Sequence, residues 1–248
     1  MADPGSGMFI NITRKMETEN ARHETPTTHN LKEYIYMTLD KSGIKFGKNT
    51  KKYNNKKNTG GDKSSLGQNY LVDYQKIFND NNINEDSNFK LLEIGIFEGR
   101  SLATFKDYYK KCEITGCDID LIPYNSTYDE LKNLGYNDSN VKIIKSNSLI
   151  KENNKFKKKY FDVIIDDGSH EYYHQAITFL NYFDNLKNNG IYIIEDTHSN
   201  TSFIFFKELA TILSNKSILN RINKYFYFYF LIYYLYFLID WVFALSAL

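Results

Sequence analysis

Two short, largely apolar runs that stop on acidic residues constrain the fold of this chain most strongly. The first run, residues 161–165, leads into Asp166 and Asp167, and the second leads into Glu195 and Asp196. Strands buried on both faces have such continuous apolar sequences, and open α/β sheets place their chemistry at the carboxyl ends of their strands. Two neighbouring strands that end in this way would bring several carboxylate oxygens together. Such oxygens are the ligands that a hard divalent cation prefers, so the sequence predicts a cation site at this edge.

Apolar runs of this kind alternate with amphipathic segments through the middle of the chain. This order predicts right-handed crossovers and an α/β fold with a doubly wound, mostly parallel sheet of the Rossmann-like type. One helix is expected to start with a capping box, Thr127-x-x-Glu130, and to end at Gly135. The predicted strands span residues 90–94, 113–119, 141–145, 161–166 and 191–195; the other predicted helices span 70–78, 100–110, 172–186 and 203–213.

The regions outside this domain, which we place at residues 70–222, have a different composition. Residues 1–30 carry no periodic apolar signal, so we expect them to be disordered or derived from cloning. Residues 31–69 are expected to hold a short helix at 31–39 and a flexible loop rich in Lys, Asn and Gly.

The last segment, residues 223–248, is an apolar tail that is almost wholly aromatic and aliphatic after residue 225. It is long enough to span a bilayer, which takes about 20 apolar residues, but its many tyrosines favour a membrane interface. Three interpretations stay open: a membrane-associating tail, the last strands of the sheet, or a non-native tail encoded by AT-rich sequence. We predict a cytoplasmic protein, with membrane association through residues 225–248 as the alternative.

Charge and cysteine content exclude some classes of function. The formal net charge is +1, so no global field favours nucleic acid as a partner. Cys112 and Cys117 are the two cysteines of the chain and do not make a disulfide framework, which is consistent with a reducing compartment. Nothing in the sequence indicates the oligomeric state.

A glycine-containing loop follows the first predicted strand of the domain. In Glu93-x-Gly95-x-x-x-Gly99, glycine lets the backbone approach a ligand and the following helix offers free N–H groups, although a simple tight turn would also need glycine. Asp118 and Asp120 end the next strand, where a carboxylate can accept the hydroxyls of a ribose. The glycine spacing does not match a dinucleotide fingerprint. It favours a nucleoside cofactor without a pyrophosphate, such as S-adenosylmethionine.

Four motifs extend this interpretation to a known family. They are Asp62-Lys63-Ser64-Ser65 with Tyr70 and Tyr74, residues 92–101, residues 166–170, and residues 190–198. With them, residues 62–200 resemble the class I S-adenosylmethionine-dependent methyltransferases, and in particular the metal-dependent sugar O-methyltransferases of the macrocin and mycinamicin type. The sequence departs from that pattern at Gln68, near where relatives often carry histidine. It also lacks a turn signal after Arg221 that would separate a sixth and a seventh strand.

The resemblance implies roles for individual residues. His170 would be the general base. Asp167, Glu195 and Asp196 would bind magnesium or another divalent cation, with Asp166 as the alternative to Asp167 because the register of the strand is not fixed by the sequence. The residues implied to contact the cofactor are Glu93, Gly95, Phe97, Ser101, Asp118, Ser146 and Asn147.

The expected activity follows from these roles. It is transfer of a methyl group from S-adenosylmethionine, with a divalent metal, to a sugar hydroxyl of a glycan or of a glycosylated small molecule. A bound cation lowers the pKa of such a hydroxyl, and an imidazole can then remove its proton. Two alternatives remain: a catechol-like small-molecule O-methyltransferase, and a non-catalytic, membrane-attached domain that retains the fold.

Overall fold

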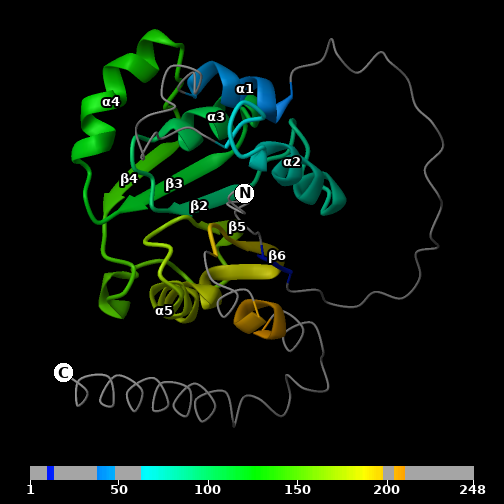
Figure 1. The fold of residues 1–248 in the computed structure, drawn as a ribbon, viewed down its shortest axis with the longest axis vertical. Coiled ribbons are helices and arrows are strands. Elements are labelled where there is room, and N and C mark those ends of the chain that lie inside the picture. Colours follow the sequence, from blue (N-terminus) through cyan, green and yellow to red (C-terminus); the bar gives the residue numbers. More distant parts are fainter. Residues whose placement is uncertain (1–9, 14–37, 48–62, 198–203, 210–248) are drawn as a thin grey trace, which may run out of the picture.

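A six-stranded sheet with helices on both faces forms the centre of the structure, a computed structural model that describes residues 10–13, 38–47, 63–197 and 204–209 (Figure 1). The strand order is β1-β6-β5-β2-β3-β4. Strands β2 to β6 are parallel to their neighbours, and β1 runs antiparallel to β6. The predicted mostly parallel α/β fold is therefore confirmed. The strands are β1 Ile10–Thr13, β2 Lys90–Ile94, β3 Glu113–Asp118, β4 Val141–Lys145, β5 Phe161–Asp166 and β6 Leu186–Ile194.

Strand β1 lies in a segment where we expected no structure. Residues 10–13 pair with residues 191–194 of β6, so the prediction for residues 1–30 is wrong for these four residues. The reason is that a four-residue edge strand has no periodicity of its own to detect, and its pairing depends on a partner far along the chain. The flexible loop predicted within residues 41–65 falls largely on 48–62, and the tail on 223–248; both lie outside the described residues.

The helices mostly match the predicted positions, with three differences. Helix α1, Leu39–Phe46, was not predicted with these bounds; the side chain of Thr38 caps its first turn, and residues 31–37 of the helix predicted at 31–39 lie outside the described residues. Helix α4 begins at Ile122, ahead of the predicted capping box, because proline occupies its first turn; Thr127 is buried inside it. The helix predicted at 172–186 ends at Tyr182, and β6 starts at Leu186. The helices are α1 Leu39–Phe46, α2 Tyr70–Asp80, α3 Arg100–Tyr108, α4 Ile122–Asn133 and α5 Tyr172–Tyr182; residues 204–209 are also helical.

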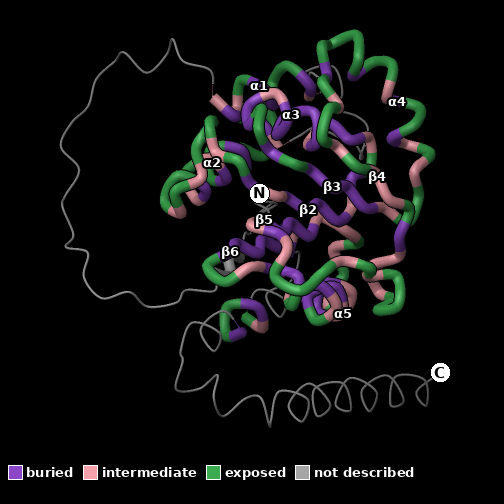
Figure 2. Tube along the Cα trace, turned by 180° about the vertical axis from the view of Figure 1, so that it is seen from behind, coloured by how far each residue is buried: buried purple, intermediate pink, exposed green. Residues whose placement is uncertain are grey.

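Alternate residues of the central strands fill two cores, one on each face of the sheet. Leu91, Val163 and Ile193 pack with α1, α2 and α3 on one face. Leu92 and Ile164 pack with α5 and residues 204–209 on the other. In Figure 2, which colours buried residues purple, these strands lie in the middle of the molecule. Because the strands are covered on both faces, their sequences are continuous apolar runs, as the sequence analysis assumed.

The strand order reverses direction between β2 and β5. From β2 the chain proceeds outward to β3 and β4, and it then crosses back to β5 on the other side of β2. The loops that follow β2 and β5 therefore diverge, and a crevice opens at the carboxyl ends of these strands. Among the described residues, no helix is long and apolar enough to cross a membrane.

Helix α2 packs on the domain, and substitution of one aromatic residue in it tests this packing. Phe78 has no exposed surface, and its ring contacts those of Phe89, Phe105 and Tyr109. We expect Phe78→Ala to lower the free energy of unfolding by about 3–5 kcal/mol, measured by urea denaturation. Val72→Ala on the exposed side of the same helix should change it by less than about 0.5 kcal/mol. Equal small effects of the two substitutions would show that α2 is not packed on the domain.

Candidate active site

The register of the sheet places three carboxylates on one face. Glu93 pairs with Ile165, and Ile165 pairs with Ile193. Side chains alternate between the faces, so Asp167 and Glu195, each two residues further along, lie on the same face as Glu93. All three point toward the side of the sheet that α2 covers.

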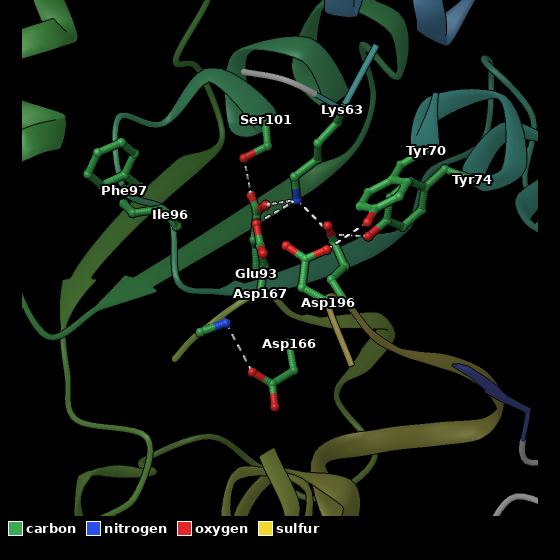
Figure 3. Close-up of polar contacts among 12 residues, drawn as sticks. Lys63, Tyr70, Tyr74, Glu93, Ile96, Phe97, Ser101, Asp166, Asp167 and Asp196 are labelled. Carbon is green, nitrogen blue, oxygen red and sulfur yellow. Dashed lines mark hydrogen bonds and ion pairs between the residues drawn. The ribbon is translucent and has the colours of Figure 1, made fainter. Parts of the chain in front are cut away.

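Lys63 lies at the centre of these carboxylates. Its ammonium nitrogen Nζ is 2.7 Å from Oδ2 of Asp167, 2.6 Å from Oε1 of Glu195 and 3.3 Å from Oε1 of Glu93. Figure 3 shows the side chain reaching from above to the carboxylates of Glu93 and Asp167, with Tyr70 and Tyr74 beside them. One cation thus joins the ends of β2, β5 and β6.

The environment keeps Lys63 charged and Tyr74 neutral. Burial opposes the charge on Lys63, but the attraction of Asp167 and Glu195 outweighs it and holds the pKa of the ammonium well above its ordinary value. Burial, together with the charge of Glu195, raises the pKa of Tyr74. The phenol of Tyr74 therefore remains protonated and donates a short hydrogen bond to Glu195.

Two residues of the site adopt a left-handed backbone conformation, which changes where their side chains point. His170 has φ +61° and Asp196 has φ +52°. The conformation of Asp196 interrupts the alternation of β6, and its carboxylate accepts a hydrogen bond of 2.6 Å from the hydroxyl of Tyr70. Nε2 of His170 is 3.9 Å from Oδ1 of Asp167 and 4.0 Å from Oδ2 of Asp196.

These three residues make up a donor set that a metal ion could use. One ligand atom each from Asp167, His170 and Asp196 can be chosen so that all lie within 4.8 Å of one another. Glu195 is not in this group, because its carboxylate faces Lys63 and Tyr74. The structure thus brings together two of the three predicted metal ligands with the predicted base.

Asp166 faces the opposite side of the sheet from Asp167. It is 1% exposed, one of its oxygens accepts a hydrogen bond of 3.3 Å from the backbone of Gly168, and Oδ2 has no partner among the described residues. Burial raises the pKa of Asp166 to about 8. Of the two alternatives left open by the sequence, the structure places Asp167 in the carboxylate cluster.

The glycine loop after β2 approaches β5 closely. Gly95 has φ +84°, and a Cβ atom there would lie 2.1 Å from the carbonyl oxygen of Asp167, so only glycine fits. Oδ2 of Asp118 accepts hydrogen bonds of 2.9 Å from the backbone N–H groups of Ile96 and Phe97. Asp118 therefore fixes the loop, a role that the sequence analysis did not include.

A cavity of about 870 Å³ runs along the carboxyl ends of the strands. Of the predicted site residues, Glu93, Ser146 and Glu195 are buried and do not line it; Glu93 accepts a hydrogen bond of 2.8 Å from Ser101 instead. The predicted residues that line the cavity are Gly95, Phe97, Ser101, Asp118, Asn147, Asp167, His170 and Asp196.

Three residues of this site received no role from the sequence. Lys63, Tyr70 and Tyr74 were named together in one motif of the family resemblance, and the two tyrosines also fall in the predicted helix 70–78, but none was given a function. Their spacing does hold a signal, since positions i and i+4 share one helix face and a buried tyrosine needs a partner for its hydroxyl. His198, a further loop histidine of the 190–198 motif, lies outside the described residues.

Comparison with known proteins agrees with this geometry. Residues 92–197 match the family described as a methyltransferase domain. L-olivosyl-oleandolide 3-O-methyltransferase of Streptomyces antibioticus is 30% identical over 125 residues, which cover 45% of this chain and 29% of that protein. The chain therefore spans less than a third of the length of this relative.

Solved structures are similar at a lower level. The MycE methyltransferase of the mycinamycin biosynthetic pathway, in complex with Mg and SAH, is 19% identical with a TM-score of 0.44, over 64% of this chain and 36% of that one. An enzyme from Staphylococcus aureus described as a putative caffeoyl-CoA O-methyltransferase is 23% identical with a TM-score of 0.40, over 50% of this chain and 56% of that one.

Residues 92–197 match a methyltransferase domain, and the doubly wound sheet is the fold expected of a class I, S-adenosylmethionine-dependent enzyme of that kind. Within that class the chain resembles the sugar O-methyltransferases of the macrocin and mycinamicin type. The family resemblance drawn from the sequence is thus confirmed.

Proposed function

We propose that the protein is an O-methyltransferase that uses S-adenosylmethionine and a divalent cation, and that its acceptor is a sugar hydroxyl. The observation that carries the proposal is the arrangement of one cavity. The glycine loop and Asp118 line one part of it, and Asp167, His170 and Asp196 line another. The printed name of the relative from Streptomyces antibioticus, which describes 3-O-methyl transfer on an L-olivosyl group, supports the sugar acceptor.

The donor set fits a divalent cation such as Mg²⁺. Carboxylate oxygens of Asp167 and Asp196 are the hard ligands that this ion prefers, and both face the cavity. A cation held there would lower the pKa of the acceptor hydroxyl. Glu195 would become a third ligand only if its contacts with Lys63 and Tyr74 were rearranged.

His170 acts as the general base in this proposal. Its Nε2 lies about equally far from Asp167 and Asp196, at 3.9 and 4.0 Å, so it borders the place where the acceptor oxygen would be held. A neutral imidazole there can take the hydroxyl proton as the oxygen attacks the methyl group. The sulfonium methyl requires only in-line placement, which the glycine loop and Asp118 provide by fixing the cofactor.

The two alternative functions predict different results. A catechol-like enzyme would methylate phenolic rather than sugar hydroxyls; that family uses lysine at the position of His170, which argues against it. A non-catalytic domain would bind the cofactor without transferring its methyl group. Against this, Asp167, His170 and Asp196 together border one cavity and offer ligand atoms within 4.8 Å of one another, an arrangement that cofactor binding alone would not require.

The decisive experiment combines binding and turnover. Calorimetry should show binding of S-adenosylmethionine, and labelled methyl transfer should be followed to a panel of free sugars, glycosides and catechols, with and without Mg²⁺. We expect transfer to a glycoside that stops when the metal is chelated. Methyl transfer that persists in the presence of a chelator would refute the proposed metal dependence. Methyl transfer to catechols alone would refute the proposed sugar acceptor.

A substitution of Asp118 tests the proposal that S-adenosylmethionine binds at this end of the cavity. We expect Asp118→Ala to weaken binding of S-adenosylhomocysteine by about 10- to 100-fold, because the ribose loses a charge-assisted hydrogen bond and the glycine loop loses its anchor. Calorimetry measures the effect. Asp120→Ala is the matched control: among the described residues its side chain accepts a hydrogen bond only from the nearby N–H of Ile122, so affinity should stay near the wild-type value. The reverse order of effects would assign the ribose to Asp120.

A further inference from the structure

Lys63 is the one positive side chain among the described residues that contacts all three buried or partly buried carboxylates at the strand ends. Its side chain is 12% exposed, so the contacts are shielded from solvent. The backbone holds it in place, because the carbonyl oxygen of Lys63 accepts a hydrogen bond of 3.0 Å from the N–H of Leu71 in the first turn of α2. Lys63 is therefore fixed relative to the helix that supplies Tyr70 and Tyr74.

The two oxygens of Asp167 have different neighbours. Oδ2 is 2.7 Å from the ammonium of Lys63, whereas Oδ1 faces Nε2 of His170. The same ammonium contacts Glu195, which the sequence analysis expected among the metal ligands. Two of the three carboxylates predicted to hold the cation are thus already paired with a cation that belongs to the chain. Figure 3 labels Lys63 and one of these two partners, Asp167.

We propose that Lys63 is a positioning residue that competes with the divalent cation for Asp167 and Glu195, and thereby limits how tightly the cation is held. This inference rests on the proposed function, since it requires a cation at these residues. The ammonium has somewhere to move, because Oε1 of Glu93 is 3.3 Å from it and does not belong to the predicted metal ligands. Lys63 would then retain one buried carboxylate as its partner while Asp167 and Glu195 turn to the metal.

Competition and structural support predict opposite changes in the affinity for the divalent cation when Lys63 is replaced. If Lys63 only supported the fold, its removal would loosen Asp167 and Glu195 and weaken cation binding. If it competes, removal of its charge frees both carboxylates and eliminates the repulsion between the ammonium and the cation, so binding becomes tighter. A charge-assisted hydrogen bond contributes on the order of a 10- to 100-fold factor to an equilibrium constant, which sets the expected size of the effect.

The test is titration of MgCl₂ into the full-length chain by calorimetry at one pH and one ionic strength. Lys63→Met, which keeps most of the length of the unbranched side chain without its charge, is expected to bind Mg²⁺ about 10- to 100-fold more tightly than the wild type. Lys63→Arg, which keeps the charge, should not gain affinity. Lys90→Met is the matched control, because it removes the same charge from an ion pair with Glu113 at the opposite end of β2, and its affinity should equal that of the wild type.

Affinity of Lys63→Met that is equal to or weaker than wild type overturns the proposal, provided that the variant still binds S-adenosylhomocysteine. Should Lys63→Met lose that binding, Lys63→Gln takes its place with the same expected gain, because the amide can still donate to Glu195. If neither the wild type nor the variants bind Mg²⁺, the competition is refuted together with the metal part of the proposed function. Binding of S-adenosylhomocysteine and methyl transfer, measured separately, then decide whether the rest of that function stands.

Discussion

Asp167→Asn is expected to abolish the response to Mg²⁺ and to lower methyl transfer by at least about 100-fold, because a bound cation contributes several kcal/mol to stabilisation of the transition state. The substitution keeps the shape of the side chain and removes the charge that faces both Lys63 and His170. Initial rates measured against Mg²⁺ concentration provide the test. Affinity for S-adenosylhomocysteine should stay close to that of the wild type.

The neighbouring residue supplies the matched control. Asp166 lies one position earlier on the same strand and also borders the cavity, but it is not in the group of possible metal ligands, so Asp166→Asn should leave the affinity for Mg²⁺ unchanged. If Asp166→Asn rather than Asp167→Asn loses the response to the metal, the register of β5 at the site is wrong. If neither substitution changes the response to Mg²⁺, no cation acts at this edge of the sheet.

His170→Asn is expected to slow the chemical step by roughly 10²- to 10⁴-fold while cofactor and cation still bind, because proton removal by a positioned base contributes that much. Asparagine is preferred to alanine here, since His170 has φ +61° and asparagine tolerates the left-handed conformation. The rate of the variant should rise with pH, because hydroxide can then replace the imidazole. Single-turnover rates at several pH values measure this.

His174 is the control for His170. Its Nδ1 lies 2.7 Å from Oγ of Ser169, and the side chain lines the same cavity without belonging to the group of possible metal ligands. His174→Asn should therefore cost far less activity than His170→Asn and should show no rescue at high pH. Full activity of His170→Asn would assign the base to another residue.

The strands of the parallel sheet could be predicted well from the sequence. Residues 90–94, 141–145 and 161–166 were placed with the observed bounds. The first and the last of these are short runs that both faces of the sheet bury, whereas β4 is a partly exposed edge strand. Helix starts were harder to predict. The capping box at Thr127 predicted that α4 begins there, but the helix begins earlier, at Ile122, where proline occupies its first turn. Helix α1 has only eight residues, which are too few to show a clear helical period in the sequence.

The acidic half of the site could be predicted for a similar reason. Asp167 and Asp196 follow adjacent parallel strands, so the topology alone brings both residues to one edge of the sheet. That their side chains meet also depends on the left-handed backbone of Asp196, which the sequence did not indicate. The contacts of Lys63, Tyr70 and Tyr74 could not be predicted in this way. They reach Glu195 and Asp196 across 121 to 132 positions of sequence, and they depend on how the segment before α2 packs on the sheet. No local pattern encodes that packing.

The two edges of the sheet bear on self-association of the domain. An unpaired strand edge exposes a row of N–H and C=O groups to which another chain can add. At one edge the four-residue strand β1 pairs with β6 and is itself the last of the described strands. At the other edge, where β4 has no further neighbour among the described strands, Lys142 and Lys145 are both exposed. Like charges on β4 oppose the pairing of two copies through this edge, and the short length of β1 leaves few backbone groups for another chain at the other edge, so both edges disfavour self-association.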